Sequence, residues 1–441
     1  MSYDDQLLPQ PELAESWDVS QDFKQMKINL RKSVVWHNGR EFTSDDVKYN
    51  ILRVRDRSIG GGTFTNQSLW FDTIETPDKN TVILSSNQSR PGVYDFLTNF
   101  NMVDKDTVEG PDVKSKAVGT GPFSFVEWAP GDHISLIRNK NYWQTGRPYL
   151  EGVRVSIVKD VQAMVTYLEA GALDAIKTPP LVDFVRLRAN PSFQALSHPT
   201  SGIIWCIGWN ALDAPLDNKT VRQALNYALD RKRFTDTIMQ GLGRAQSLPW
   251  LPASPAYEAG KENFYTFDLD KAQSLLAEAG VTGLNIDWIL VENAEANQFA
   301  QVYQADLAKI GVKLNVKVLE PVVWSDQVSN KKYNGGYIAT STRANLLPGT
   351  MLSSSRLSDP VLNNSGFSDD TYTKLVADAG LEADPAKAKQ IYSQINDFLL
   401  DQSFAVFLTP APPTMIVNSA VHGVSTESFG GFGYTDAWMS S

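Results

Sequence analysis

Helical and strand-like hydrophobic patterns alternate along both halves of this chain. Residues 215–239 have apolar side chains at helical spacing after a candidate cap at Asp217 or Asn218, and residues 43–56 repeat that pattern after Thr43 or Ser44. Between such helices lie runs in which apolar residues alternate or are continuous, as in strands. These strand-like runs are QMKINLRKSVVW, NTVILSS, FSFVEWA, HISLIRN, GVRVSIV, IIWCIGWN, VKLNVKVLE and FAVFLTP. Helices inserted between strands predict an α/β protein built of mixed sheets.

The length of the chain predicts more than one domain. A chain of 441 residues exceeds the size at which a single core usually stops growing. One boundary is expected near residues 199–203, before the strand-like run 203–210. A second is expected at the proline-rich TPAPPT, residues 409–414.

Composition limits the kind of partner. The hydrophobic fraction of 42% and charged fraction of 20% are typical of a soluble globular protein, and no apolar run is long enough to span a membrane. A net charge of −10 argues against nucleic acid or an anionic membrane as the main partner. Cys206 is the only cysteine, so neither an internal disulfide nor a thiolate metal cluster is expected. The opening residues have no signal-peptide pattern.

Motifs of catalysis are absent from the sequence. It contains no P-loop, nucleophile elbow, HExxH helix or CxxC pair. The glycine clusters at 60–62 and 241–246 are expected to be loops. Cys206 lies in a strand-like run and is expected to be a buried, inert thiol. The four histidines have no ligand-like spacing, so we expect no catalytic residues, no cofactor and no metal site; they are His37, His133, His198 and His422.

Three long stretches, in the same order, resemble the peptide, opine and nickel class of bacterial extracellular solute-binding proteins (family 5), which serve ABC importers. They are residues 11–53, beginning PELAESW; residues 117–176, beginning AVGTGPFSF; and residues 210–231, NALDAPLDNKTVRQALNYALDR. The resemblance runs from residue 9 to the end of the chain. Within the first stretch, Trp36, His37 and Asn38 are expected to be structural.

The resemblance implies a two-lobed periplasmic-binding-protein fold of cluster C type, with mixed sheets joined by two hinge strands. Lobe I with its inserted subdomain would span 1–202, lobe II 203–411, and residues 412–441 would return to lobe I. Members of the family also have a segment before the one matching LLPQPELAESW, with a signal peptide and a strand of lobe I. We therefore expect this N-terminal strand region to be missing from the sequence, as in a trimmed or longer natural chain.

One segment within the second lobe, GYIATSTRANLLPGTML (336–352), suggests the ligand. In peptide-binding members the matching segment has an aspartate that binds the free α-amino group of the peptide. Counted back from Pro348, Ala344 stands in its place, and no acid occurs between 335 and 352. A buried ammonium group without a counter-ion costs on the order of several kcal/mol. Ordinary free-amine peptides are therefore expected to bind poorly.

The same segment offers groups suited to an anion. The guanidinium of Arg343 matches a carboxylate or phosphate, Asn345 donates and accepts, and Ser341 and Thr342 add hydroxyls. Alternatively, Arg343 points to solvent or pairs with an acid elsewhere. Arg356 is a second candidate, for which a surface salt bridge is the alternative.

Two tryptophans are further candidates for ligand contact. Trp205 aligns with an aromatic residue that touches ligand in peptide-binding relatives, and it shares one strand face with Ile207 and Trp209. A tryptophan stacks on a sugar or peptide plane, or forms part of a core, and for Trp205 we favour ligand contact. Trp70 is a candidate cleft-wall residue.

These features predict a periplasmic or lipid-anchored, monomeric binding protein without enzymatic activity. It would capture a small polar anionic solute by hinge closure and deliver it to the permease subunits of an ABC transporter. We favour an opine-like sugar–amino acid conjugate. The alternatives within the family are an oligopeptide or dipeptide, an oligosaccharide and a nickel chelate. The contrasting classes are a hydrolase with an unrecognised carboxylate pair, and a receptor or chaperone-like module.

Overall fold

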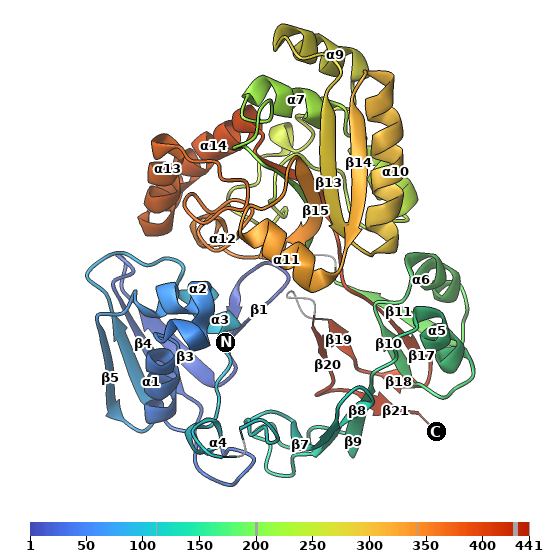
Figure 1. Cartoon of the computed structure of the whole chain (residues 1–441). Coiled ribbons are helices and arrows are strands. Elements are labelled where there is room, and N and C mark those ends of the chain that lie inside the picture. Colours follow the sequence, from blue (N-terminus) through green and yellow to red (C-terminus); the bar gives the residue numbers. More distant parts are fainter. Residues whose placement is uncertain (112, 199–201, 342, 427–430, 441) are drawn as a thin grey trace. The chain divides into compact units, whose positions relative to one another are not determined.

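The computed structural model describes residues 1–111, 113–198, 202–341, 343–426 and 431–440. The chain forms two compact units (Figure 1). Unit 1 comprises Met1–His198 and Pro413–Ser441, and unit 2 comprises Pro199–Pro412. The boundaries expected from the sequence, 202/203 and 411/412, lie close to these.

Unit 1 is built from small sheets and short helices. Its elements are β1 (Ser2–Tyr3), β2 (Pro9–Gln10), β3 (Ala14–Val19), β4 (Gln25–Leu30), α1 (Ser44–Arg53), α2 (Arg57–Ser68), β5 (Thr73–Asp78), β6 (Thr81–Ser85), α3 (Val93–Asn99), α4 (Lys105–Val108), β7 (Phe123–Ala129), β8 (His133–Arg138), β9 (Gly152–Ser156), α5 (Val161–Glu169), β10 (Ala175–Lys177), α6 (Leu181–Arg188), β11 (Phe193–Ser197), β17 (Thr414–Asn418), β18 (Val421–His422), β19 (Ser425–Thr426), β20 (Phe432–Gly433) and β21 (Trp438–Met439).

Three sheets carry most of unit 1. The strands are ordered β3-β4-β6-β5, β7-β8-β9 and β10-β17-β11, and every pairing in them is antiparallel. The first sheet packs its apolar face against α1 and α3 in a core that includes Ile28, Val82 and Phe96. In the third, β17 returns from unit 2 to lie between β10 and β11.

Unit 2 contains a single larger sheet flanked by helices. Its elements are β12 (Ile204–Trp209), α7 (Lys219–Tyr227), α8 (Arg231–Arg233), the π-helix η1 (Phe234–Ile238), the 3₁₀ helix η2 (Ala259–Lys261), α9 (Leu269–Glu278), β13 (Asn285–Val291), α10 (Ala294–Lys309), β14 (Lys313–Leu319), α11 (Pro321–Ser329), β15 (Gly336–Ser341), α12 (Pro348–Leu352), α13 (Asp370–Leu381), α14 (Pro385–Gln402) and β16 (Ala405–Pro410).

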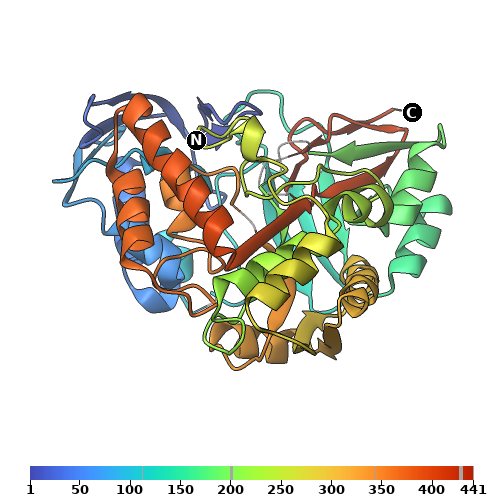
Figure 2. The same ribbon diagram turned by 90° about the horizontal axis from the view of Figure 1, so that it is seen from above.

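The sheet of unit 2 is mixed, in the order β14-β13-β15-β12-β16. β13 runs parallel to β14 and β15, while β12 runs antiparallel to β15 and β16. On one face Trp288 packs against Tyr303 of α10, and on the other Tyr337 packs against Trp324 of α11. Helices α13 and α14 lie side by side in both views (Figures 1 and 2). The expected α/β class with mixed sheets is confirmed.

One helix expected from the sequence is broken. The pattern over 215–239 forms α7, which Asn218 caps through the backbone N–H of Thr220, and the helix ends at Tyr227. Asp230 then accepts from the N–H of Arg233 and starts a new turn, α8, which continues into η1. The second cap interrupts the helix, although the apolar spacing continues through it.

The glycines at 60–62, expected to form a loop, lie instead within α2. Gly61 is non-helical with φ of 58°, so the element is two short helical turns joined by a kink. A side chain on Gly60 would place its Cβ 2.1 Å from the carbonyl oxygen of Val54. The glycine is therefore required by close packing on the preceding helix end.

Candidate functional site

One end of the β12–β15 pair brings most of the predicted ligand residues together. In the antiparallel register Trp205 lies opposite Thr340, and Ile204 lies opposite Ser341. Beyond the strand end, the N–H of Ala344 donates to the carbonyl of Gly202 at 3.0 Å. Residues far apart in the sequence, namely 202–205 on one side and 339–341 with 343–346 on the other, therefore form one cluster within unit 2, which we call the β12–β15 end.

Arg343 occupies a tight turn at this end. Its φ of 98° lies in the left-handed region, which a non-glycine residue rarely adopts. Its carbonyl accepts from the N–H of Leu346 at 3.0 Å. The side chain is half-buried, and this burial lowers the pKa of Arg343. Strained conformations of this kind persist only where the surrounding structure holds them in place. They cluster at active sites and ligand sites.

Asn345 lies deeper, with only 1% of its surface exposed. It packs against the backbone of Gly202, where a Cβ would lie 2.3 Å from Oδ1 of Asn345. The sequence analysis did not single out Gly202, because its requirement arises only when the two segments meet. This packing against Gly202 holds in place the turn that carries Arg343.

The serines near this turn form a short polar contact. The Oγ atoms of Ser341 and Ser355 are 3.2 Å apart, and Ser355 is buried. Arg356, the next residue, is exposed, and its carbonyl accepts from the N–H of Asn364. Thr342 lies outside the described residues.

Several buried polar residues beyond Ser341 were not anticipated. The segment from α12 to Ser365 buries several hydroxyls and amides: Ser365 Oγ donates to Asn363 Oδ1 at 2.6 Å, whereas Ser358 Oγ finds no partner among the described residues. Single serines and asparagines in a sequence give no periodic signal, so this set could not be found before the fold was known. Its members are Thr350, Ser355, Ser358, Asn363, Asn364 and Ser365.

Trp205 is placed as a core residue at the edge of this cluster. Its ring packs edge-to-face on Phe234 at 5.9 Å, and Phe234 packs on Phe299 of α10. Only 7% of Trp205 is exposed. The sequence analysis favours ligand contact for Trp205; in the structure its ring packs on Phe234, and the residue lies beside the segment that carries Arg343.

Trp70 lies in unit 1 and is not part of this cluster. It is half-buried against the core of that unit, and the guanidinium carbon of Arg90 lies 5.6 Å from its ring centroid. This contact is a cation–π pair.

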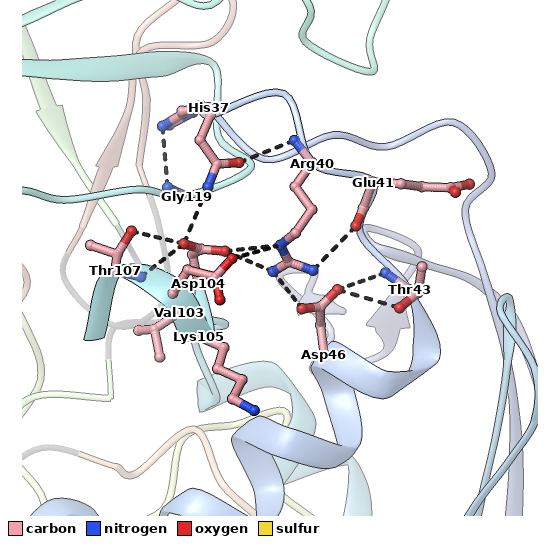
Figure 3. Close-up of polar contacts among 12 residues, drawn as sticks. His37, Arg40, Glu41, Thr43, Asp46, Val103, Asp104, Lys105, Thr107 and Gly119 are labelled. Carbon is pink, nitrogen blue, oxygen red and sulfur yellow. Dashed lines mark hydrogen bonds and ion pairs between the residues drawn. The ribbon is translucent and has the colours of Figure 1, made fainter. Parts of the chain in front are cut away.

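Unit 1 contains a polar network that the sequence analysis did not resolve (Figure 3). Arg40 Nη2 contacts Asp46 Oδ1 and Asp104 Oδ1, each at 2.7 Å, and Asp104 also accepts from the backbone N–H of Thr107 at 3.0 Å. The hydrogen bond to Asp46 raises the pKa of Arg40. Burial alone would raise the pKa of Asp104, but Arg40 and Thr107 hold it below its usual value. The network joins the starts of α1 and α4.

His37 and Asn38 belong to the same region and make structural contacts. The N–H of Gly119 donates to Nδ1 of His37 at 3.2 Å, so Nε2 carries the proton and donates to the carbonyl of Gly121 at 2.9 Å. Nδ2 of Asn38 donates to Asp104 at 3.3 Å. These contacts agree with the structural role expected for the signature.

Among the described residues there is neither a candidate metal cluster nor a candidate membrane-spanning helix. No group of three or more histidine, cysteine, aspartate or glutamate side chains in the described ranges could hold a metal ion. Among the helices that the structure describes, none is long and apolar enough to cross a membrane.

Comparison with known proteins identifies relatives along nearly the whole chain. Heme-binding protein A of Haemophilus influenzae is 32% identical over 348 residues, which are 72% of this chain and 62% of that protein. Di/tripeptide-binding protein 1 of Pseudomonas aeruginosa is 28% identical over 460 residues, 95% of this chain and 84% of that protein.

Solved structures share the fold. The periplasmic binding protein AgaA of A. tumefaciens R10, in complex with agropinic acid, superposes with a TM-score of 0.85 at 25% identity, covering 100% of this chain and 92% of that one. AppA of Bacillus subtilis, in complex with a nonapeptide, superposes with a TM-score of 0.84 at 21% identity, covering 100% and 92%. The model of the bacterial extracellular solute-binding proteins, family 5, matches residues 9–360. The chain therefore belongs to family 5 of the bacterial extracellular solute-binding proteins, the substrate-binding components of ABC importers.

Proposed function

We propose that this protein binds a small polar anionic solute, an opine-like conjugate of a sugar and an amino acid, and delivers it to an ABC permease. The observation that carries the proposal is the β12–β15 end, which holds the half-buried Arg343 in a segment without any acid from 335 to 352. A carboxylate on the ligand would pair with Arg343 in a bidentate contact.

A neighbour in structure supports the choice of ligand class. AgaA was solved with agropinic acid and is 25% identical to this chain. The solute's carboxylate would bind Arg343, and the hydroxyl of Ser341 would be a further donor. Asn345 lies within the same segment of unit 2, and Trp205 and Arg356 lie near it in that unit.

A second candidate is a short peptide. The di/tripeptide-binding relative matches 95% of this chain, so its ligand class must be tested. Against it stands Ala344, at the position where peptide-binding members have the aspartate for the ligand's ammonium group. A peptide would need an acid from another part of the chain to pair with that charge.

The place of action is also part of the proposal. We infer that the protein works as a monomer outside the cytoplasmic membrane, in the periplasm or held by a lipid anchor. Capture by hinge closure would reduce the radius of gyration measured by small-angle scattering when ligand is added. The ligand should be recovered chemically unchanged, because the proposal includes no catalytic step.

A thermal-shift panel tests the ligand class. It compares sugar–amino acid conjugates with free-amine dipeptides, oligosaccharides, nickel–histidine and haemin. A ligand at about a hundred times its Kd stabilises the native state by about 2.7 kcal/mol, which moves the melting temperature measurably. We expect acidic conjugates to raise it and free-amine peptides to leave it unchanged. A shift with dipeptides alone would contradict the proposal.

Substitution of Arg343 tests the contact itself. Arg343→Gln should weaken binding of the acidic conjugate by at least about tenfold, since hydrogen bonds to charged groups contribute about 1.5–3 kcal/mol. Lys332→Gln removes an exposed cation from the same unit, one that is paired with Asp326, and should leave the Kd unchanged. Equal effects from the two variants would show that long-range charge, and not the contact, is responsible.

A further inference from the structure

A cavity in unit 2 lies beside α8 and η1, and it is distinct from the β12–β15 end. Its volume is about 590 Å³, within the range of about 300–1,000 Å³ typical of small-molecule sites. Its walls come from three separate segments: residues 230–236, residues 243–245 and residues 262–267. The residues that matter here are Arg231, Ala245, Tyr265 and Phe267.

Arg231 is the buried charge of this cavity, with 4% of its surface exposed. Nε donates to the carbonyls of Phe407 at 2.8 Å and Gln246 at 3.2 Å. Nη1 donates to the carbonyl of Asn226 at 3.3 Å, and Nη2 donates to Oδ1 of the same residue. Every one of these acceptors is neutral.

The guanidinium has donors left over. A guanidinium carries five N–H groups, and the contacts above use one at each nitrogen. One N–H on Nη1 and one on Nη2 therefore find no further acceptor among the residues that the structure describes. Either of these donors can bind an oxygen of an anion.

The other charges that line the cavity are neutralised by their neighbours. Lys232 pairs with Asp236, and Arg244 pairs with Glu262. Asp230 lies 3.5 Å from Nε of Arg233. Within the described part of the chain, Arg231 is thus the lining cation without a carboxylate partner. Burial accordingly lowers the pKa of Arg231 to about 10.

Aromatic rings provide the remaining wall. The ring centroid of Tyr265 is 6.0 Å from the guanidinium carbon of Arg231, and Phe267 is 40% exposed. A flat apolar group could cover Phe267 while its charged end reaches Arg231. Such a ligand would bury exposed aromatic surface and supply the missing counter-charge.

We propose that this cavity binds a small organic carboxylate with a flat apolar body, with the carboxylate on Arg231 and the body against Tyr265 and Phe267. The site does not depend on the solute proposed above, because it shares no residue with the β12–β15 end. Benzoate is the probe, and benzamide is its uncharged match in shape.

Ligand-observed NMR and calorimetry with the full chain test the proposal. We use the Arg343→Gln variant as the starting protein, so that benzoate held at the proposed solute site does not contribute. Benzoate should bind, and benzamide should bind at least about tenfold more weakly, because it lacks the charge that Arg231 would pair with. Equal binding of the two probes, or no binding of benzoate, would overturn the proposal.

Three further variants locate the probe. Ala245 supplies none of the hydrogen-bond acceptors of Arg231, so Ala245→Trp places a large ring in the cavity without removing one, and it should abolish benzoate binding. Phe267→Ala should weaken it, whereas Phe264→Ala should not, because Phe264 is a similarly exposed aromatic outside the lining. If benzoate binds equally well to Ala245→Trp, its site is elsewhere and the assignment fails. Direct replacement of Arg231 is avoided, since it would also release the carbonyls of Phe407 and Gln246.

Discussion

His133 lies between two carboxylates and an arginine on the β7-β8-β9 sheet. Nε2 is 3.0 Å from Glu127 Oε1, and Nδ1 is 2.8 Å from Asp132 Oδ2 and 3.1 Å from Arg154 Nη2. The hydrogen bonds to Glu127 and Asp132 raise the pKa of His133 above 6.5. Neutral His133 accepts from Arg154 at Nδ1, whereas protonated His133 donates to Asp132. The protonation state of the ring therefore decides whether Nδ1 bonds to Arg154 or to Asp132.

The raised pKa predicts how stability depends on pH. Because the folded pKa exceeds the unfolded one, the contribution of His133 is full below about pH 6.5 and is lost as the pH rises through the folded pKa. An NMR titration of the ring measures this pKa. Glu127→Gln should lower it, and Arg154→Met should raise it, because each removes a charge that acts on the imidazole. An unchanged pKa in Glu127→Gln would show that the contact does not form.

The single thiol gives a second test at the scale of one residue. Cys206 is 2% exposed, and burial raises its pKa to about 12. Because the thiolate is the reactive form, we expect no labelling by iodoacetamide at pH 8 in the native protein and rapid labelling in denaturant. Rapid native labelling would mean that β12 opens readily. Labelling therefore also reports unfolding of unit 2.

At the scale of the elements, helices α12 and α13 come close together at a glycine, Gly349. A Cβ on Gly349 would lie 2.6 Å from the backbone N of Gly380. Gly349→Ala should destabilise the protein by about 1–3 kcal/mol, the usual cost of overpacking, as measured by denaturant unfolding. The matched control is Gly380→Ala, where a Cβ meets nothing within 4 Å. Because alanine has the higher helix propensity, Gly380→Ala should cause no loss, and a similar loss in both variants would show that the close contact at Gly349 is not the cause.

The elements that could be predicted are those with a local cause. Thr43 starts α1 through reciprocal contacts with Asp46, Asp369 caps α13, and Gly280 follows α9 with φ of 70°. Each of these signals is complete within a few residues of sequence. The kink in α2 and the break before Asp230 depend instead on close packing and on a competing cap, which periodicity does not reveal.

The same division applies to the candidate site. The sequence singles out Arg343 because its segment lacks acids, and that property is visible in a single stretch. It could not show that Asn345 packs on Gly202, or that Ser355 meets Ser341, because those contacts join residues brought together by the β12–β15 register. The packing of Trp205 could not be foreseen for a related reason, since a core partner such as Phe234 lies on another element.

At the scale of the whole molecule, the chain passes from unit 1 to unit 2 and back again. The return strand β17 lies between β10 and β11, with Ile416 opposite both Ile176 and Ala195 and fully buried. A chain that ends at Pro412 would keep every element of unit 2 but would remove this central strand from unit 1. The two flanking strands would then have no hydrogen-bonded neighbour in their sheet.

Hydrogen exchange read by mass spectrometry measures that consequence. In the shortened chain, the amides of β10 and β11 should exchange freely, while those of β12 and β15 keep their protection, since unit 2 has its own core. Full-length Ile416→Val is the mild control and should leave both regions protected. Protection that persists in β10 and β11 would mean that they do not depend on β17. Loss of protection throughout would show instead that unit 2 needs the return segment, and that the two units fold as one.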